Sequence, residues 1–195
     1  MYTLIGTRAS RAFRVLWLLE ELGEPYAHTP AAPGSDDIRA LNPSGKIPAL
    51  VVDDTVLTDS VAIMTYLTDK HGAFTTPPGS LERAHQDAMT LQILDDIDAL
   101  LWMAGRHTFI LPKEHRVAEI KPSLMWEYGR NLTRISDAFT GPFVMGDKMT
   151  VPDILLTYCL RWAAMFGFPA PDEKLTAYMA RMQERPALQR AADLP

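Results

Sequence analysis

The chain has 195 residues, of which 47% are hydrophobic and 22% charged, and its formal net charge is −5. This composition is typical of a folded globular protein and excludes disordered and collagen-like chains. The acidic balance argues against nucleic-acid binding, which needs a clustered basic face. No unbroken apolar run approaches the ~20 residues that span a bilayer, so we expect no membrane segment. A single cysteine excludes an internal disulfide and cysteine-based zinc sites. Because the chain has no disulfide framework, we expect a cytoplasmic protein. We also expect no bound metal.

The N-terminal third alternates between strand and helix patterns. A short β-type run is followed by apolar residues at the i, i+3, i+4, i+7 spacing of an amphipathic helix. Strand and helix patterns then continue up to Lys70, punctuated by glycine and proline. The predicted strands are Tyr2–Gly6, Tyr26–Thr29, Pro48–Val52 and Thr55–Thr58, and the predicted helices begin near Arg14, Ser35 and Asp59 or Ser60. The order β-α-β-α-β-β-α predicts a thioredoxin-like sheet.

Beyond the proline- and glycine-rich segment Thr75–Gly79, only helical patterns remain. We predict two domains, an α/β domain at residues 1–76 and an all-α domain at residues 80–195. The helices of the second domain are predicted to begin near Ser80 and to cover Lys113–Phe139, Val151–Phe166, Lys174–Gln183 and Pro186–Ala192.

The segment Asn42–Leu50, with the sequence NPSGKIPAL, places a proline where a strand begins. A cis bond between Ile47 and Pro48 would turn the Ile47 backbone away from the sheet, where it can pair with a peptide. The alternative is that Pro48 is simply the first residue of the strand, in the trans form.

Asp59 and Ser60 stand where a predicted strand ends and a helix starts. Free N–H groups and the positive helix terminus favour a carboxylate ligand there. Ser60 can hydrogen-bond that carboxylate, and Asp59 can hold an ammonium group. Ordinary N-capping of the helix is the structural alternative.

The loop after the first strand, Thr7–Arg14, carries two hydroxyl groups and three guanidinium groups at the start of a helix. For reaction at neutral pH a thiol pKa of about 8.5 must fall. A hydroxyl beside a positive helix end lowers that pKa because it stabilises the thiolate. The alternative is that Ser10 caps the helix and the arginines are solvated.

Together these three segments resemble the glutathione transferase family, in particular its bacterial serine- or threonine-type members with a zeta- or theta-like first loop. The turn N-P-S-G-K-I-P-A-L, the D-S pair at a helix start and the run Phe13–Gly23 appear in the family's order. A further family signature is the segment Gly146–Asp153, in which Thr150 and Asp153 fit a structural capping box. The resemblance covers essentially the whole chain.

The resemblance implies a binding site for glutathione as co-substrate. Ile47 would pair through its backbone with the cysteinyl part, next to Pro48, and Lys46 would lie near the glycyl carboxylate. Asp59 and Ser60 would hold the γ-glutamyl end. In the family the glutathione thiolate attacks an electrophile, and the protein activates the thiol and holds both partners close.

The residue that activates the thiol is predicted to carry a hydroxyl side chain. No cysteine lies in the first loop, and Tyr2 lies in the strand. Counting back from the helix start, Thr7 and Ser10 both match positions of serine in family classes. We favour Ser10, because the helix N-terminus adds to its field, with Thr7 as rival and Arg11 as a further polarising group.

The resemblance also implies a site for a small hydrophobic electrophile and a homodimer. Asp96 is a candidate for a contact across the dimer to the neighbour's glutathione. The electrophile site is predicted to lie between the first helix and the end of the long helix after the linker, at Phe13, Trp102, Met103, Arg106 and His107.

The leading functional hypothesis is therefore a glutathione transferase with a role in detoxification. The alternatives keep glutathione and change the reaction to isomerisation of the maleylacetoacetate type, dehalogenation, or reduction of disulfides or peroxides. A non-catalytic binding or stress-regulatory module of the same fold is the remaining alternative.

Overall fold

The computed structural model describes residues 1–194 and divides into two compact units. The first comprises Met1–Pro78 together with residues 182–194, and the second comprises Gly79–Arg181. The C-terminal segment thus packs with the first unit, whereas the division expected from the sequence places it in the helical domain. That division, into residues 1–76 and 80–195, stays a prediction.

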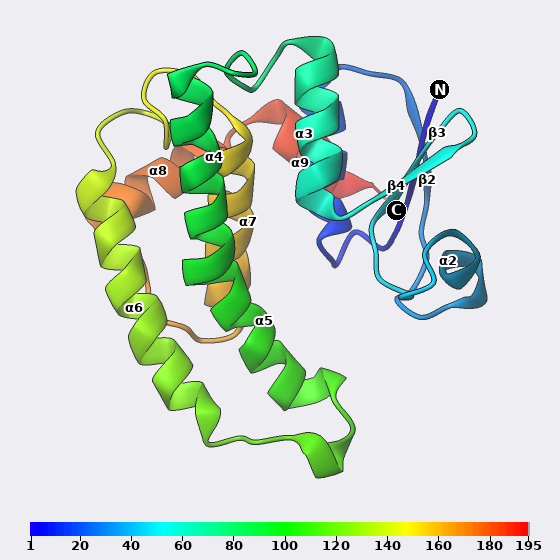
Figure 1. The fold of residues 1–195 in the computed structure, drawn as a ribbon. Helices are drawn as coiled ribbons and strands as arrows, with labels where there is room; N and C mark the ends of the chain where they lie inside the picture. The colour runs from blue at the N-terminus through cyan, green and yellow to red at the C-terminus, as the bar shows by residue number, and fades with distance from the viewer. Residues whose placement is uncertain (195) are drawn as a thin grey trace. The chain divides into compact units, whose positions relative to one another are not determined.

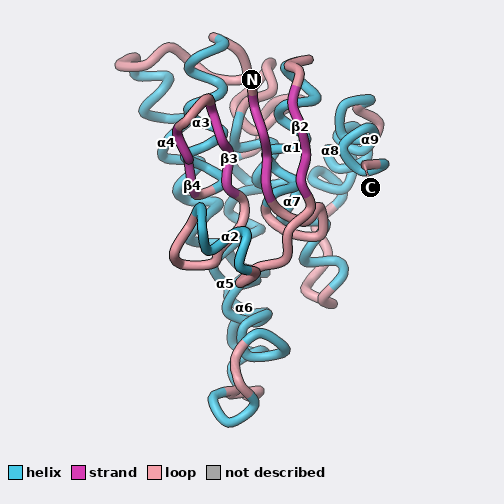
Figure 2. Tube along the Cα trace, turned by 90° about the vertical axis from the view of Figure 1, so that its right-hand side faces the viewer, coloured by secondary structure: helices cyan, strands magenta, loops and turns pink. Residues whose placement is uncertain are grey.

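The first unit is built on a four-stranded mixed sheet with the order β2-β1-β3-β4, which Figure 2 shows. The strands β1 and β2 are parallel, as a crossover through a helix requires, while β3 pairs antiparallel with β1 and with β4. The strands are β1 (Tyr2–Ile5), β2 (Tyr26–Thr29), β3 (Ala49–Val52) and β4 (Thr55–Thr58), and the helices between and after them are α1 (Ala12–Leu22), α2 (Asp36–Leu41) and α3 (Ser60–His71). The predicted α/β class and its element order are confirmed.

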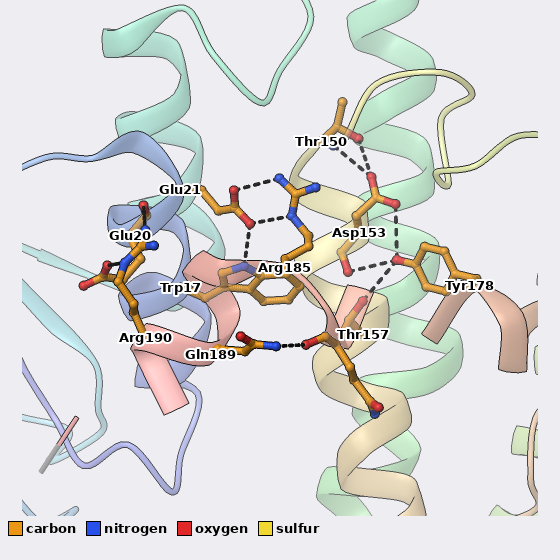
Figure 3. A network of polar contacts seen from close by, with 11 residues as sticks. Trp17, Glu20, Glu21, Thr150, Asp153, Thr157, Tyr178, Arg185, Gln189 and Arg190 are labelled. Atoms are coloured by element: carbon orange, nitrogen blue, oxygen red, sulfur yellow. Dashed lines mark hydrogen bonds and ion pairs between the residues drawn. The ribbon is translucent and has the colours of Figure 1, made fainter. Parts of the chain in front are cut away.

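Helix α1 forms the centre of this unit, and its residues Val15–Leu19 are all fully buried. The C-terminal helix α9 (Pro186–Asp193) packs on α1. Figure 3 shows that two arginines flanking and within α9 reach carboxylates on α1. Arg185 forms a bidentate ion pair with Glu21, at 2.6 and 2.7 Å, and the indole N–H of Trp17 donates to the same carboxylate. This part of the chain is therefore held to α1 by charge as well as by apolar packing.

The second unit consists of helices, which confirms the predicted all-α class of this part. Its helices are α4 (Leu81–Ile93), α5 (Ala99–Gly105), α6 (Ile120–Ala138), α7 (Val151–Met165) and all but the last two residues of α8 (Glu173–Gln183). Helices α4 to α7 pack side by side (Figure 1). A π-helical turn, Leu94–Asp98, joins α4 to α5, and a second one, Arg106–Ile110, follows α5. Within the described part of the chain, no helix is both long and apolar enough to cross a membrane.

The continuous helix expected over Lys113–Phe139 begins only at Ile120; Lys113–His115 form a separate 3₁₀ turn and residues 116–119 are not helical, so that prediction is wrong at its start. Arg116 explains the difference. Its guanidinium group donates to three backbone carbonyls, of Thr108, Phe109 and Leu111, at 2.7 to 3.0 Å. These bonds satisfy the carbonyls at the end of the preceding helical turn and hold Arg116 in an extended backbone conformation.

Thr150 and Asp153 form a capping box at the start of α7, which Figure 3 shows. The Asp153 carboxylate is fully buried and accepts hydrogen bonds from the backbone N–H groups of Thr150 and Val144, both at 2.8 Å. The hydroxyl of Tyr178 donates to it at 3.2 Å. Burial raises the pKa of Asp153 to about 6, although these hydrogen bonds act in the opposite direction. Asp153 therefore joins three segments of the helical unit.

Candidate functional site

The three segments singled out in the sequence meet at one edge of the sheet. The strand register pairs Ile5 with Ala49 and Ala49 with Thr58. The end of β1, the start of β3 and the end of β4 are therefore adjacent. The loop after β1, the turn before β3 and the start of α3 leave the sheet at this common edge.

The turn before β3 is held by its own polar side chains. The Asn42 amide donates to the Lys46 carbonyl at 2.8 Å, and its oxygen accepts from the backbone N–H and the hydroxyl of Ser44. Gly45 adopts a φ of 68°, and its carbonyl accepts a bond from the N–H of Gly34. The Ile47–Pro48 bond that follows is cis, so the structure shows the cis form and not a trans proline that simply begins the strand. The Lys46 side chain is exposed to solvent.

Asp59 caps helix α3, and its Oδ1 accepts the N–H groups of Val61 and Ala62 at 2.8 and 3.2 Å. Its φ of 70° and ψ of 127° are costly for a residue with a side chain, and such conformations cluster at ligand sites. The other oxygen of this exposed carboxylate has no partner among residues 1–194. One side chain here therefore caps the helix and also presents a negative charge to solvent.

Ser60, beside Asp59, is buried, and its hydroxyl oxygen accepts from Nη1 of Arg14 at 3.4 Å. Arg14 lies on α1 and is itself completely buried. The start of α1 is thereby linked to the start of α3. The sequence interpretation of the arginines as solvated missed this residue, because the bond joins positions 46 residues apart.

The loop after β1 begins at Gly6, with a φ of 145°. A Cβ atom at Gly6 would lie 3.0 Å from the Cβ of Ala12 and 3.2 Å from that of Ile47. Only glycine fits at this point without displacing its neighbours. The N–H groups of Gly6 and Thr7 donate to the carbonyls of Thr29 and Ala31, both at 3.1 Å. The loop is thus fixed at its base next to the cis-Pro48 turn.

The two hydroxyl groups of this loop, on Thr7 and Ser10, differ in the hydrogen bonds that they make. The Ser10 hydroxyl donates to the Thr7 carbonyl at 2.6 Å and accepts the N–H of Ala12 at 3.1 Å. It therefore behaves as a cap of the first turn of α1. The half-buried Thr7 hydroxyl has no hydrogen-bond partner among residues 1–194. Thr7 is thus the hydroxyl that remains able to donate to a ligand.

The residues predicted for the electrophile site belong to different units. Phe13 lies on α1 in the first unit and packs beside Trp17, with 6.5 Å between ring centroids. Trp102 and Met103 lie half-buried on α5 in the second unit. Arg106 and His107 belong to the π-helical turn that follows, and Nδ1 of His107 accepts the N–H of Val117 at 3.0 Å. That these residues form one electrophile site stays a prediction.

Asp96 lies in the π-helical turn between α4 and α5, where its carboxylate pairs with Arg134 of α6 at 2.9 Å. It lines an open hollow of about 620 Å³ together with Leu91, Gln92, Leu94 and Asp95. The contact of Asp96 across a dimer stays a prediction. In the described residues, no three His, Cys, Asp or Glu side chains gather as a metal site would require.

Comparisons with known proteins agree across both units. A family model described as the glutathione S-transferase N-terminal domain matches residues 10–70, and one described as the C-terminal domain matches residues 100–186. The chain is 32% identical over 161 residues to glutathione S-transferase GstA of Escherichia coli O157:H7, covering 80% of this chain and 77% of the relative. It is 26% identical over 159 residues to maleylacetoacetate isomerase of Rhizobium meliloti, covering 76% and 75% of the two chains. Among solved structures, the theta class glutathione S-transferase of Xanthomonas axonopodis pv. citri, with glutathione bound, has a TM-score of 0.81 and 26% identity, covering 100% of this chain and 98% of the other.

Proposed function

The chain belongs to the glutathione S-transferase family, and on that premise we propose that it binds glutathione at the sheet edge described above and activates its thiol with a hydroxyl group. Glutathione is the co-substrate: its thiol proton passes to solvent, the thiolate attacks a carbon atom of a small hydrophobic electrophile, and a sulfur–carbon bond forms as the bond from that carbon to a leaving group such as halide breaks. The observation that carries the proposal is the meeting of the first loop, the cis-Pro48 turn and the start of α3 at one edge of the sheet. That the relative from Xanthomonas was solved with glutathione bound supports the ligand.

Each part of glutathione has a matching group at this edge. The Ile47 backbone, outside the strand and ahead of Pro48, would pair with the cysteinyl residue as an added strand does. The exposed Lys46 would attract the glycyl carboxylate. The α-carboxylate of the γ-glutamyl end would bind at the N-terminus of α3 near Ser60, where the helix field favours an anion. The unpaired oxygen of Asp59 would hold the ammonium group beside it.

For the thiol, the geometry favours Thr7 over Ser10. The Ser10 hydroxyl already donates its proton to the Thr7 carbonyl and can stabilise a thiolate only by giving up that bond. The Thr7 hydroxyl can donate without losing one. Arg11, half-buried at the start of α1, would add a positive field. We therefore assign thiol activation to Thr7 and a supporting structural role to Ser10.

Single variants test this assignment. Thr7→Ala should lower kcat/KM with a standard aryl halide about a hundredfold, as expected for loss of one donor to a developing or stabilised anion. Thr7→Ser keeps the donor and should retain most of the activity. Ser10→Ala should have the smaller effect of the two alanine variants. Wild-type kcat/KM in both alanine variants would refute hydroxyl activation.

The remaining parts of the proposal concern the second substrate and assembly. We propose a small hydrophobic electrophile as the second substrate, with a role in detoxification, and the cytoplasm as the location of the protein. A homodimer is proposed, with Asp96 as its cross-dimer contact. Gel filtration at the 21.8 kDa of a single chain would contradict the dimer.

A second candidate reaction is glutathione-dependent isomerisation. It is favoured by relatives named maleylacetoacetate isomerase in Rhizobium meliloti and in Dictyostelium discoideum. An isomerase regenerates glutathione unchanged, whereas a transferase consumes it. Measuring free thiol before and after turnover of maleylacetoacetate separates the two reactions.

A further inference from the structure

His28 makes a contact with the first loop that neither the sequence motifs nor the proposed chemistry requires. It lies on the edge strand β2, opposite Leu4 in the register with β1. Its ring reaches past the end of β1, and Nε2 lies 2.8 Å from the carbonyl oxygen of Gly6. A carbonyl oxygen only accepts hydrogen bonds, so Nε2 carries the proton and donates. Both the neutral Nε2–H tautomer and the protonated ring meet this requirement.

The Gly6 carbonyl belongs to the peptide unit that directly precedes the Cα atom of Thr7. It belongs to the peptide plane that joins Gly6 to Thr7, so its direction sets the rotation of that plane. The N–H of Thr7 lies in this same plane and donates to the carbonyl of Ala31, while the N–H of Gly6, in the preceding plane, donates to Thr29. His28 adds a side-chain bond at the carbonyl of this plane, so the plane is held at its C=O as well as at its N–H.

The backbone at Gly6 also has an unusual freedom that a side-chain bond would restrict. Glycine adopts positive φ about as readily as negative φ, and this one stands at 145°. Its lack of a Cβ lets the loop approach Ala12 and Ile47 closely, at the cost of a softer backbone. The hydrogen bond from the His28 ring adds to the Thr7–Ala31 backbone bond in restricting the orientation of that peptide.

We propose that His28 is a positioning residue for thiol activation, which holds the Gly6–Thr7 peptide so that the Thr7 hydroxyl points at the glutathione sulfur. This inference rests on the proposed function. His28 itself touches neither the thiol nor the electrophile, and it takes no part in proton transfer. Without its hydrogen bond, Thr7 samples other orientations and the thiolate is stabilised for less of the time.

The test is a pH titration of the glutathione thiol in the complex, in which the ultraviolet absorbance of the thiolate is the readout. His28→Phe keeps a ring of similar size and removes the donor, and His28→Gln restores an amide donor. Tyr26→Phe is the matched control, because Tyr26 lies two residues away on the same face of β2 and donates to Glu20 at 2.7 Å. If His28→Phe fails to fold, His28→Leu takes its place.

His28→Phe should raise the pKa of bound glutathione by roughly one unit, which is about a tenfold loss of thiolate at a pH well below the wild-type pKa of that thiol. At such a pH the dissociation constant of glutathione should change less than about twofold, while kcat/KM falls about tenfold as the thiolate fraction does. His28→Gln should recover most of both, and Tyr26→Phe should match the wild type. An unchanged thiol pKa in a folded, glutathione-binding His28→Phe protein would overturn the inference. Failure of the wild type to bind glutathione would instead overturn the proposed function, and this inference with it.

Discussion

Replacing Asp153 with alanine should strongly destabilise the helical unit without touching the proposed glutathione site. The carboxylate is fully buried and accepts hydrogen bonds from Val144, Thr150 and Tyr178. Two of these donors are backbone N–H groups. The third, the Tyr178 hydroxyl, also contacts Thr157 at 3.1 Å, so it keeps a partner when the carboxylate is removed.

The expected loss follows from the two donors that would be left unpaired. A buried polar group without a partner costs about 1–3 kcal/mol, so two such groups cost about 2–6 kcal/mol. A domain is typically stable by about 5–15 kcal/mol, and the variant should therefore unfold at markedly lower denaturant concentration. Asparagine keeps one acceptor oxygen, so Asp153→Asn should lose about half as much.

Urea unfolding at neutral pH, followed by circular dichroism, measures these differences. Asp147→Ala is the matched control, because Asp147 is exposed in the same connecting segment, and it should stay within about 0.5 kcal/mol of the wild type. A loss below about 1 kcal/mol in Asp153→Ala would refute the view that the buried carboxylate holds the start of α7 in place.

Two further predictions concern pH and the C-terminal helix. Burial raises the pKa of Asp153 from 3.8 to about 6, so the folded state binds this proton more tightly than the unfolded chain. The stabilisation from this protonation is complete below about pH 4 and is lost as the pH rises through about 6. The free energy of unfolding of the wild type should therefore exceed that of Asp153→Asn by less at about pH 6 than at about pH 4. A difference that grows with pH would contradict this direction of the pKa shift. Arg185→Ala leaves the nearly buried Glu21 carboxylate without its bidentate partner and should cost about 2–4 kcal/mol in urea unfolding. The matched variant Arg190→Ala removes a more exposed ion pair and should cost less than about 1 kcal/mol, so equal losses in the two variants would rule out burial as the cause.

The elements of the first unit could be predicted from local pattern alone. Strand alternation and the punctuation by glycine and proline reproduce the observed order of strands and helices. The helices of the second unit were likewise visible in their apolar spacing. The π-helical turns at Leu94–Asp98 and Arg106–Ile110 were not, since a π turn inside a helix leaves the apolar stripe almost unchanged.

The contacts that complete the site were beyond the sequence because their partners are distant along the chain. Arg14 meets Ser60 and His28 meets Gly6 only after the sheet has formed. Arg14 stands between apolar neighbours in the sequence, which gives no sign of a buried polar bond. The preference for Ser10 over Thr7 rested on helix position, whereas the hydroxyl geometry, which a sequence does not contain, favours Thr7.

Calorimetric titration of the wild-type protein with glutathione tests the central claim most directly, with cysteinylglycine as the matched ligand. Cysteinylglycine lacks the γ-glutamyl end and therefore loses the groups proposed to meet Asp59 and Ser60. We predict saturable binding of glutathione at millimolar concentration or below, and clearly weaker binding of cysteinylglycine. A folded protein that shows no binding of glutathione at millimolar concentration would contradict the account.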